Sequence, residues 1–132
     1  MGGFGVIVLI ALAVFVFGQP AAPVATAALP LEVSVQEAYQ LQDDGAFLLD
    51  VRTPEEWAAG HVPGATLIPL DELASRTSEL PKGEDIVVIC RSGNRSATGR
   101  DILLSAGFES VTSVAGGFNQ WVANGFPSVV GD

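Results

Sequence analysis

The sequence predicts an α/β domain built on a parallel β-sheet, and three observations support that fold class. From Leu31 onward, short apolar runs alternate with helix-like segments, which is the pattern of βαβ units. The run 85–90 is the most strongly β-branched in this domain, as expected for a strand covered on both faces. Capping motifs and glycines mark the ends of the intervening helices. A length of 132 residues suits one such domain.

Two capping motifs define the first helices. The capping box at 34–37, Ser-Val-Gln-Glu, opens a helix that is expected to run to about Asp44. The apolar run 46–51 then predicts a buried strand. A second capping box at 53–56, with proline at the first helical position, opens another helix that ends at Gly60.

The next three elements follow the same alternation. The run 65–70 predicts a strand, and 71–80 predicts a short helix that Pro81 terminates. The run 85–90 is then the candidate central strand of the sheet, because a continuous apolar stretch suits burial on both faces.

The remaining chain supplies a helix, a strand and a final helix. A helix is expected over 94–106, with Gly107 as its C-terminal cap. A strand over 110–117 and a helix over 118–124 complete the domain. Helical spacing directs four residues of the first of these helices toward the core: Ala97, Ile102, Leu103 and Ala106.

The net charge of the chain limits the classes of ligand that it is expected to bind. A formal charge of −9 argues against nucleic acid or an anionic membrane surface as a partner, because both bind clustered cations. Half of the six basic residues nevertheless fall within ten residues after Cys90, which indicates a small anionic ligand. A single cysteine excludes an internal disulfide and a cysteine-rich zinc site, so no metal is expected.

The first part of the chain reads as a targeting segment. Residues 1–18 predict an uncharged hydrophobic helix, either a signal peptide or a transmembrane anchor, at the short end of the roughly 17 to 25 residues that span a bilayer. Residues 19–30 read as a Pro/Ala-rich tether and 31–132 as the domain. Cleavage after Ala27 and an uncleaved anchor both remain open. We expect a cell-envelope location, exported, periplasmic or membrane-anchored, with the domain extracytoplasmic.

Cys90 lies at the carboxyl end of the predicted central strand and just before a helix, where ligands bind in open parallel sheets. The residues that follow let backbone N–H groups form an anion-binding nest at the positive end of the helix dipole. That setting stabilises a thiolate, which is a nucleophile toward anionic electrophiles. The candidate substrate-binding cradle comprises Arg91, Ser92, Gly93, Asn94, Arg95 and Ser96.

Spacing and a second strand end add to this hypothesis. Four residues separate Cys90 from Arg95, whereas protein tyrosine phosphatases place five there, so the tighter loop suits one sulfur atom better than a phosphoryl group. Asp50 and Arg52 leave another strand end. They either contact the substrate or form an internal ion pair that braces the loop.

Three stretches, in the right order, resemble a single-domain rhodanese over about residues 31–130. The family's first signature is similar to residues 48–70, LLDVRTPEEWAAGHVPGATLIPL. Its active-site loop is similar to residues 87–97, VVICRSGNRSA, and its closing signature to residues 114–129, VAGGFNQWVANGFPSV. Three signatures together are specific, whereas the cysteine–arginine spacing alone is weak.

The resemblance implies a rhodanese-like five-stranded parallel sheet flanked by helices, with a structural role for His61. It implies that Cys90 takes sulfane sulfur from a small anionic donor such as thiosulfate, or from a polysulfide, and holds it as a persulfide. The sulfur then passes to a thiol or cyanide acceptor. No metal or organic cofactor is implied, and a membrane is contacted only through an uncleaved N-terminal segment.

Two other functions remain open. One is a low-turnover sulfur-carrier or redox-sensing binding module that serves a membrane partner, in which Cys90 would carry the same adduct without steady turnover. The other is a phosphatase or arsenate reductase of similar fold, against which the four-residue spacing to Arg95 speaks.

Overall fold

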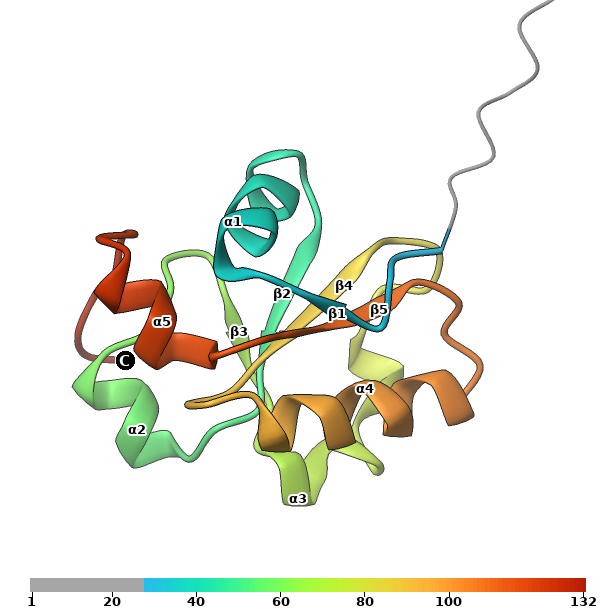
Figure 1. Ribbon diagram of the computed structural model, residues 1–132. Helices are drawn as coiled ribbons and strands as arrows, with labels where there is room; N and C mark the ends of the chain where they lie inside the picture. Colours follow the sequence, from blue (N-terminus) through green and yellow to red (C-terminus); the bar gives the residue numbers. More distant parts are fainter. Residues whose placement is uncertain (1–27) are drawn as a thin grey trace, which may run out of the picture.

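The computed structural model describes residues 28–132, which form a five-stranded sheet with helices on both faces (Figure 1). Neighbouring strands all pair in parallel, in the order β1-β5-β4-β2-β3. The α/β fold and the five-stranded parallel sheet are therefore confirmed. The strands are β1 (Glu32–Val33), β2 (Phe47–Asp50), β3 (Thr66–Leu67), β4 (Ile86–Ile89) and β5 (Val111–Val114).

The predicted signal or anchor segment, residues 1–18, lies outside the described residues, as does the tether up to residue 27. In the described part of the chain, no helix has the length and apolar character needed to cross a membrane. The described chain begins against the loop that precedes β5, where the Leu29 N–H donates to Ser110 Oγ at 3.3 Å.

Helices cover both faces of the sheet (Figure 1). Two of them pack on one face and share a core with Val87 and Ile89 of β4, while two pack on the other and share a core with Ile86 and Val88. The first pair is α1 (Val35–Asp43) and α5 (Gly117–Ala123), and the second is α3 (Leu70–Leu73) and α4 (Asn94–Ser105). The remaining helical elements are α2 (Pro54–Ala59) and a 3₁₀ helix (Thr77–Glu79).

β4 occupies the centre of the sheet, as the run 85–90 predicts. It pairs with β2 on one side and β5 on the other, and all four of its residues are buried. A strand in this place is covered on both faces, which is why an unbroken β-branched run fits it. Its central position puts the residue that follows it, Cys90, in the middle of the sheet's carboxyl edge.

Both predicted capping motifs begin helices, but only the one at 53–56 forms the full reciprocal box; at 34–37 the Glu37 carboxylate accepts from Ser34 Oγ instead of from the Ser34 N–H. Ser34 Oγ accepts from the Glu37 N–H at 3.1 Å at the start of α1. At the start of α2, Thr53 Oγ1 accepts from the Glu56 N–H at 3.2 Å, and Glu56 Oε1 accepts from the Thr53 N–H at 3.4 Å. The helices end at Asp43 and Ala59, each one residue short of the predicted last residue.

The predicted strand over 65–70 is too long. Only Thr66–Leu67 joins the sheet, as β3, pairing with Leu49 and Asp50 of β2. The strand stops there because Pro69 is already the N-cap of α3, although the N–H groups of Ile68 and Leu70 on either side of it still donate to the Asp50 and Val51 carbonyls. β3 is an edge strand, so nothing pairs with its other side within the described sheet.

The predicted helix over 71–80 is divided into two pieces, α3 and the 3₁₀ helix. Ser75 Oγ donates to the Glu72 carbonyl at 2.9 Å, which competes with a helical hydrogen bond to that oxygen. The Arg76 N–H bonds to the Leu73 carbonyl three residues back at 3.0 Å, which is 3₁₀ geometry. Pro81 lies beyond the last helical residue, as predicted.

The helix predicted over 94–106 is confirmed as α4, but its buried face is partly different. Leu103 is buried as expected, together with Ser96 and Gly99. Ala97 and Ile102 are half-buried. Ala106 is exposed because it is the C-cap, one residue past the end of the helix, so its predicted core position is wrong.

No pattern in the sequence predicts β1, because two residues are too few to show a period. Its partner β5 defines it. The Ser113 N–H donates to the Leu31 carbonyl at 3.0 Å, and the Ala115 N–H donates to the Val33 carbonyl at 2.8 Å. The first strand is thus added to the sheet by the last one, far away in sequence.

Candidate active site

Cys90 directly follows β4 and is buried, with 1% of the residue exposed. The Gly93 N–H donates to Cys90 Sγ at 3.0 Å. Ser96 Oγ lies 3.4 Å from the same sulfur. The end of the central strand therefore places the thiol among hydrogen-bonding groups of the loop that follows it.

The N-terminus of α4 faces this sulfur. Gly93, the N-cap, has φ 111°, in the left-handed region that glycine adopts without strain, and it offers no side-chain acceptor to the first turn. The first N–H groups of a helix have no partner within the helix, and they carry its positive dipole end. The loop thus leaves backbone donors free for the sulfur, as the nest predicted from the sequence requires.

Two opposing effects act on the pKa of the Cys90 thiol. Burial is the largest single effect, and it raises the pKa because it disfavours the charged thiolate. Hydrogen bonds from the Ser96 side chain and from the backbone N–H groups of Ser96, Gly93 and Ser92 lower it. Together the hydrogen bonds outweigh burial, so the pKa of Cys90 lies below its usual value. The site stabilises a thiolate.

The start of α5 holds the loop in place. The Phe118 N–H donates to the Cys90 carbonyl at 2.7 Å, and the Asn119 N–H donates to the Arg91 carbonyl at 3.0 Å. Gly117 makes this approach possible, because a Cβ atom there would lie 2.4 Å from the Cys90 carbonyl oxygen. The second glycine of the closing pair, Gly117, therefore packs directly on the backbone of the nucleophile.

Arg95 is held by Glu56 of α2. Its Nη1 and Nη2 donate to Glu56 Oε1 and Oε2 at 2.7 and 2.9 Å, a bidentate pair. The hydrogen bond from Arg95 is the main reason that the pKa of Glu56 falls to about 2. The hydrogen bond to Glu56 is also the main cause of the raised pKa of Arg95, and smaller contributions from charge on Cys90 and Asp50 show that its guanidinium lies close enough to feel the sulfur.

Asp50 and Arg52 form a buried ion pair, the second of the two alternatives considered from the sequence. Arg52 Nη2 donates to Asp50 Oδ2 at 2.8 Å, and the residues are 3% and 0% exposed. The same guanidinium donates to the Gly60 carbonyl at 2.7 Å and lies over the Phe118 ring, 4.3 Å from its centroid. The pair ties the end of β2 to α2 and α5, on either side of the Cys90 loop.

The other cradle residues lie at the surface. Arg91, Ser92 and Asn94 are exposed. Within residues 28–132, Arg91 forms no ion pair, unlike Arg95. It is therefore the charged side chain of the loop that is left available to solvent.

His61 packs against α2 and pairs with the C-terminal segment through its backbone. Its Nδ1 lies 2.9 Å from the Trp57 carbonyl, and its ring stacks on that of Trp57 at a centroid separation of 3.7 Å. Its backbone exchanges two hydrogen bonds with Val129. These contacts fit the structural role expected for it.

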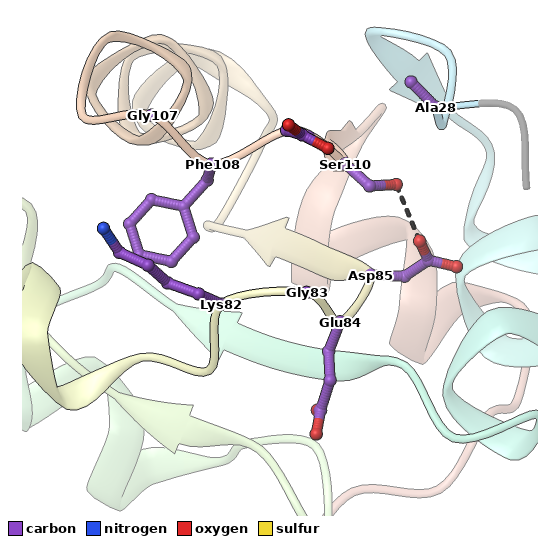
Figure 2. A pocket seen from close by; sticks show the side chains of 9 residues that line it. Ala28, Lys82, Gly83, Glu84, Asp85, Gly107, Phe108 and Ser110 are labelled. Atoms are coloured by element: carbon purple, nitrogen blue, oxygen red, sulfur yellow. Dashed lines mark hydrogen bonds between the residues drawn. The ribbon is translucent and has the colours of Figure 1, made fainter.

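One cavity of the described residues lies away from the thiol. It has a volume of about 520 Å³, and Cys90 is not among its lining residues. Figure 2 shows Lys82 beside the Phe108 ring and a hydrogen bond from Ser110 Oγ to Asp85, at the amino ends of β4 and β5. Cys90, which follows β4, lies at the opposite edge of the sheet from this cavity.

The structure brings together some predicted residues and adds others. Cys90, Gly93 and Ser96 meet at the sulfur, while Arg95 turns toward Glu56. The sequence pattern indicates Glu56 only as part of a capping box. Ser113 is a buried polar residue of β5, and its Oγ lies 2.7 Å from Ser96 Oγ. The sequence predicts it only as part of a strand. A hydroxyl within a strand buried on both faces was the available signal for it.

Comparison with known proteins gives a family. The rhodanese-like domain model matches residues 34–124. The chain is 38% identical over 112 residues to thiosulfate sulfurtransferase 16, chloroplastic, of Arabidopsis thaliana, covering 76% of this chain and 93% of that relative. It is also 38% identical over 86 residues to a sulfurtransferase of Allochromatium vinosum, covering 65% of this chain and 80% of that relative.

Solved structures show the same fold. The rhodanese-related protein from Thermoplasma volcanium superposes with a TM-score of 0.71 at 30% sequence identity. The superposition covers 76% of this chain and 99% of the other. The described domain therefore corresponds to nearly the whole of that protein.

Proposed function

This chain belongs to the rhodanese-like domain family and is related to sulfurtransferases, and we propose that it transfers sulfane sulfur through a persulfide on Cys90. The observation that carries the proposal is the environment of Cys90 Sγ. A buried thiol whose pKa is lowered by loop hydrogen bonds is a ready nucleophile. The same donors suit a persulfide, which also carries negative charge.

The first proposed step loads the cysteine. The Cys90 thiolate attacks the outer sulfur of thiosulfate, a new S–S bond forms, and the bond between the two thiosulfate sulfurs breaks. Sulfite leaves with the electron pair of that bond, so the step balances without an external oxidant. The Gly93 N–H and the Ser96 hydroxyl, which stabilise the thiolate, then face the persulfide.

The second proposed step unloads it. A nucleophilic acceptor, a thiolate or cyanide, attacks the outer sulfur of the persulfide, and the Cys90 thiolate leaves with the bonding electrons. The low pKa of Cys90 favours this step as well, because a thiol of lower pKa is a better leaving group. Both steps are two-electron displacements at sulfur, so the proposed cycle uses no metal and no organic cofactor.

The position of Arg91 favours a small anionic molecule as the sulfur donor. It is exposed at the loop that holds Cys90, and it forms no ion pair within residues 28–132. On a chain with a formal charge of −9, such a cation offsets the repulsion that a dianion like thiosulfate meets on approach. We propose that it contributes to donor binding rather than to the chemical step.

The test is loading and turnover of the full chain with thiosulfate and cyanide. We expect a gain of one sulfur atom on Cys90 in the intact mass, and formation of thiocyanate that Cys90→Ser abolishes. Lys82→Ala is the matched control, because it removes an exposed cation at the opposite edge of the sheet and should leave both results unchanged. Absence of a sulfur adduct with thiosulfate and with polysulfide would falsify the proposal.

A sulfur-carrier role is the second candidate, and the burial of Cys90 favours it. With 1% of the residue exposed, a persulfide there is shielded from adventitious thiols. A carrier would gain the same sulfur atom but would turn over negligibly with cyanide. Steady-state rates of thiocyanate formation therefore separate the two roles.

We propose a cell-envelope location, on the basis of the hydrophobic run at 1–18. The intact mass of the protein recovered from membrane and soluble cell fractions tests this. Retention of residues 1–27 in the membrane fraction supports an anchor, and loss of residues up to Ala27 supports a cleaved signal peptide. Recovery of the full-length chain from the cytosolic fraction contradicts both.

A further inference from the structure

We propose that Ser113 of β5 is a positioning residue that holds the Ser96 hydroxyl ready to donate to the Cys90 thiolate. The inference deepens the proposed function, on which it rests only for the role of the thiolate as nucleophile. Ser113 lies 17 residues beyond Ser96 in the sequence, and within residues 28–132 it forms no hydrogen bond with the sulfur.

The three side chains form a short buried chain of hydrogen-bonding groups. Ser113 Oγ lies 2.7 Å from Ser96 Oγ, which lies 3.4 Å from Cys90 Sγ. Ser96 and Ser113 are 0% and 1% exposed. Buried hydrogen bonds of this kind are stronger than exposed ones, because the surroundings screen them less.

Counting donors and acceptors fixes the direction of the first hydrogen bond. Within residues 28–132, Ser96 Oγ is the one partner within hydrogen-bond distance of Ser113 Oγ. Because a buried hydroxyl proton left without an acceptor costs free energy, and Ser96 Oγ is the acceptor within reach, we take Ser113 as the donor to Ser96. The Ser96 hydroxyl then has its own proton free for one of two other acceptors, the Gly93 carbonyl at 3.1 Å or Cys90 Sγ.

The protonation state of Cys90 decides between these acceptors. The neutral thiol donates its proton to Ser96 Oγ, so the Ser96 proton points to the Gly93 carbonyl. When the thiol ionises, its proton goes to solvent and the Ser96 proton turns to the sulfur. Ser113 donates to Ser96 Oγ in both states, so it makes Ser96 a stronger donor to the thiolate and keeps its oxygen in place.

The test measures the thiolate without any sulfur donor. Cys90 is the only cysteine, so the rate of alkylation of the full chain by iodoacetamide as a function of pH reports its ionisation. We expect Ser113→Ala to move the profile to higher pH. At a pH below the midpoint of the profile, alkylation should slow by about twofold to tenfold, the value of one hydrogen bond to a buried group.

A double-mutant cycle shows whether Ser113 acts through Ser96. Ser96→Ala should move the alkylation profile further than Ser113→Ala does. In the Ser96→Ala background, Ser113→Ala should have no additional effect, because the hydroxyl through which it acts is gone. Ser113→Thr, which keeps a hydroxyl, should restore the parent profile.

Thr112→Val is the matched control. Thr112 is the neighbouring residue of β5 and faces the other side of the sheet, and its buried Oγ1 has no hydrogen-bond partner within residues 28–132. This variant removes a buried hydroxyl from the same strand without touching Ser96, so its alkylation profile should match the parent. Circular dichroism melts verify that each variant is folded.

The outcomes are distinct from those of the sulfur-transfer test. A parent-like alkylation profile in folded Ser113→Ala overturns the inference, and so does an effect of Ser113→Ala that adds in full to that of Ser96→Ala. Failure of sulfur loading would leave the alkylation result untouched. Conversely, an unchanged profile in Ser113→Ala would not alter the sulfur adduct expected on Cys90.

Discussion

Gly117 shows how one residue without a side chain shapes the site. It has φ 55°, and a Cβ atom there would lie 2.4 Å from the Cys90 carbonyl oxygen and 2.6 Å from the Arg91 carbonyl carbon. Both neighbours are backbone atoms of the active-site loop, so neither can move aside without moving the nucleophile. The hydrogen bonds from α5 to the loop depend on this close approach.

We predict that Gly117→Ala costs at least about 3 kcal/mol of unfolding free energy, from the left-handed backbone and from the clash. Gly125→Ala is the control, because Gly125 also has positive φ, 75°, but has open space around it. It should cost only about 1 kcal/mol. Urea unfolding followed by circular dichroism measures both, and equal losses would mean that the loop tolerates the added methyl group.

At the scale of elements, three helices contact the active-site loop. α4 presents its N-terminus to the sulfur, α5 binds the backbone of the loop, and α2 holds Arg95 through Glu56. The Glu56–Arg95 pair is the only one of these links that is a side-chain ion pair between two helices. Its strength therefore depends on pH.

We predict that the Glu56–Arg95 pair loses its contribution to stability in acid. The pKa of Glu56 is about 2 in the folded chain and 4.5 as an unperturbed carboxyl, so the unfolded state takes up a proton first as the pH falls. The contribution is complete above about pH 5 and is lost between there and about pH 2. Because the pair is partly exposed, about 1 kcal/mol is expected at neutral pH.

Glu56→Gln measures this contribution, because glutamine keeps the capping box and removes the charge. The difference in unfolding free energy between parent and variant should be largest at pH 6 to 7 and shrink steadily toward pH 3. Glu79→Gln, which breaks an exposed pair with Arg76, is the control and should show a smaller difference. A difference for Glu56→Gln that stays constant with pH would exclude the ion pair as its cause.

At the scale of the whole molecule, the active-site cysteine and the start of the described chain lie at opposite edges of the sheet. The carboxyl edge carries Cys90, and the described chain begins at the opposite edge, where the Leu29 N–H contacts Ser110. Leu31 and Val33 then pair with β5 through their carbonyls. The segment that leads into the domain thus stabilises the sheet without approaching the sulfur.

We predict that a chain starting at residue 28 unfolds at the same urea concentration as the full chain, whereas one starting at residue 34 is about 2 kcal/mol less stable. The shorter chain loses the burial of Val33 and two backbone hydrogen bonds to β5. Sulfur loading on Cys90 should persist in whatever fraction remains folded. Equal stability of the two truncated chains would show that β1 contributes nothing.

Much of this architecture could be predicted because its signals are local. Capping motifs at 34–37 and 53–56 and the apolar run before Cys90 depend on neighbours in the chain, and each lies where it was expected. The division of the predicted helix 71–80 could not be foreseen, because the sequence does not say whether the Ser75 hydroxyl points to solvent or donates to the Glu72 carbonyl. β1 could not be predicted because it is defined only by its pairing with β5, which is distant in the sequence.

The sequence by itself determined the parallel sheet, the strand-end cysteine and the length of the loop, since hydrophobic period, capping residues and spacing are properties of adjacent residues. Only the tertiary structure decided that Glu56 holds Arg95, that Gly117 packs on the Cys90 carbonyl and that Ser113 reaches Ser96. The residues that these contacts join lie 17 to 39 positions apart in the sequence and belong to different elements. Contacts of that kind form only when the sheet brings its carboxyl ends to one edge.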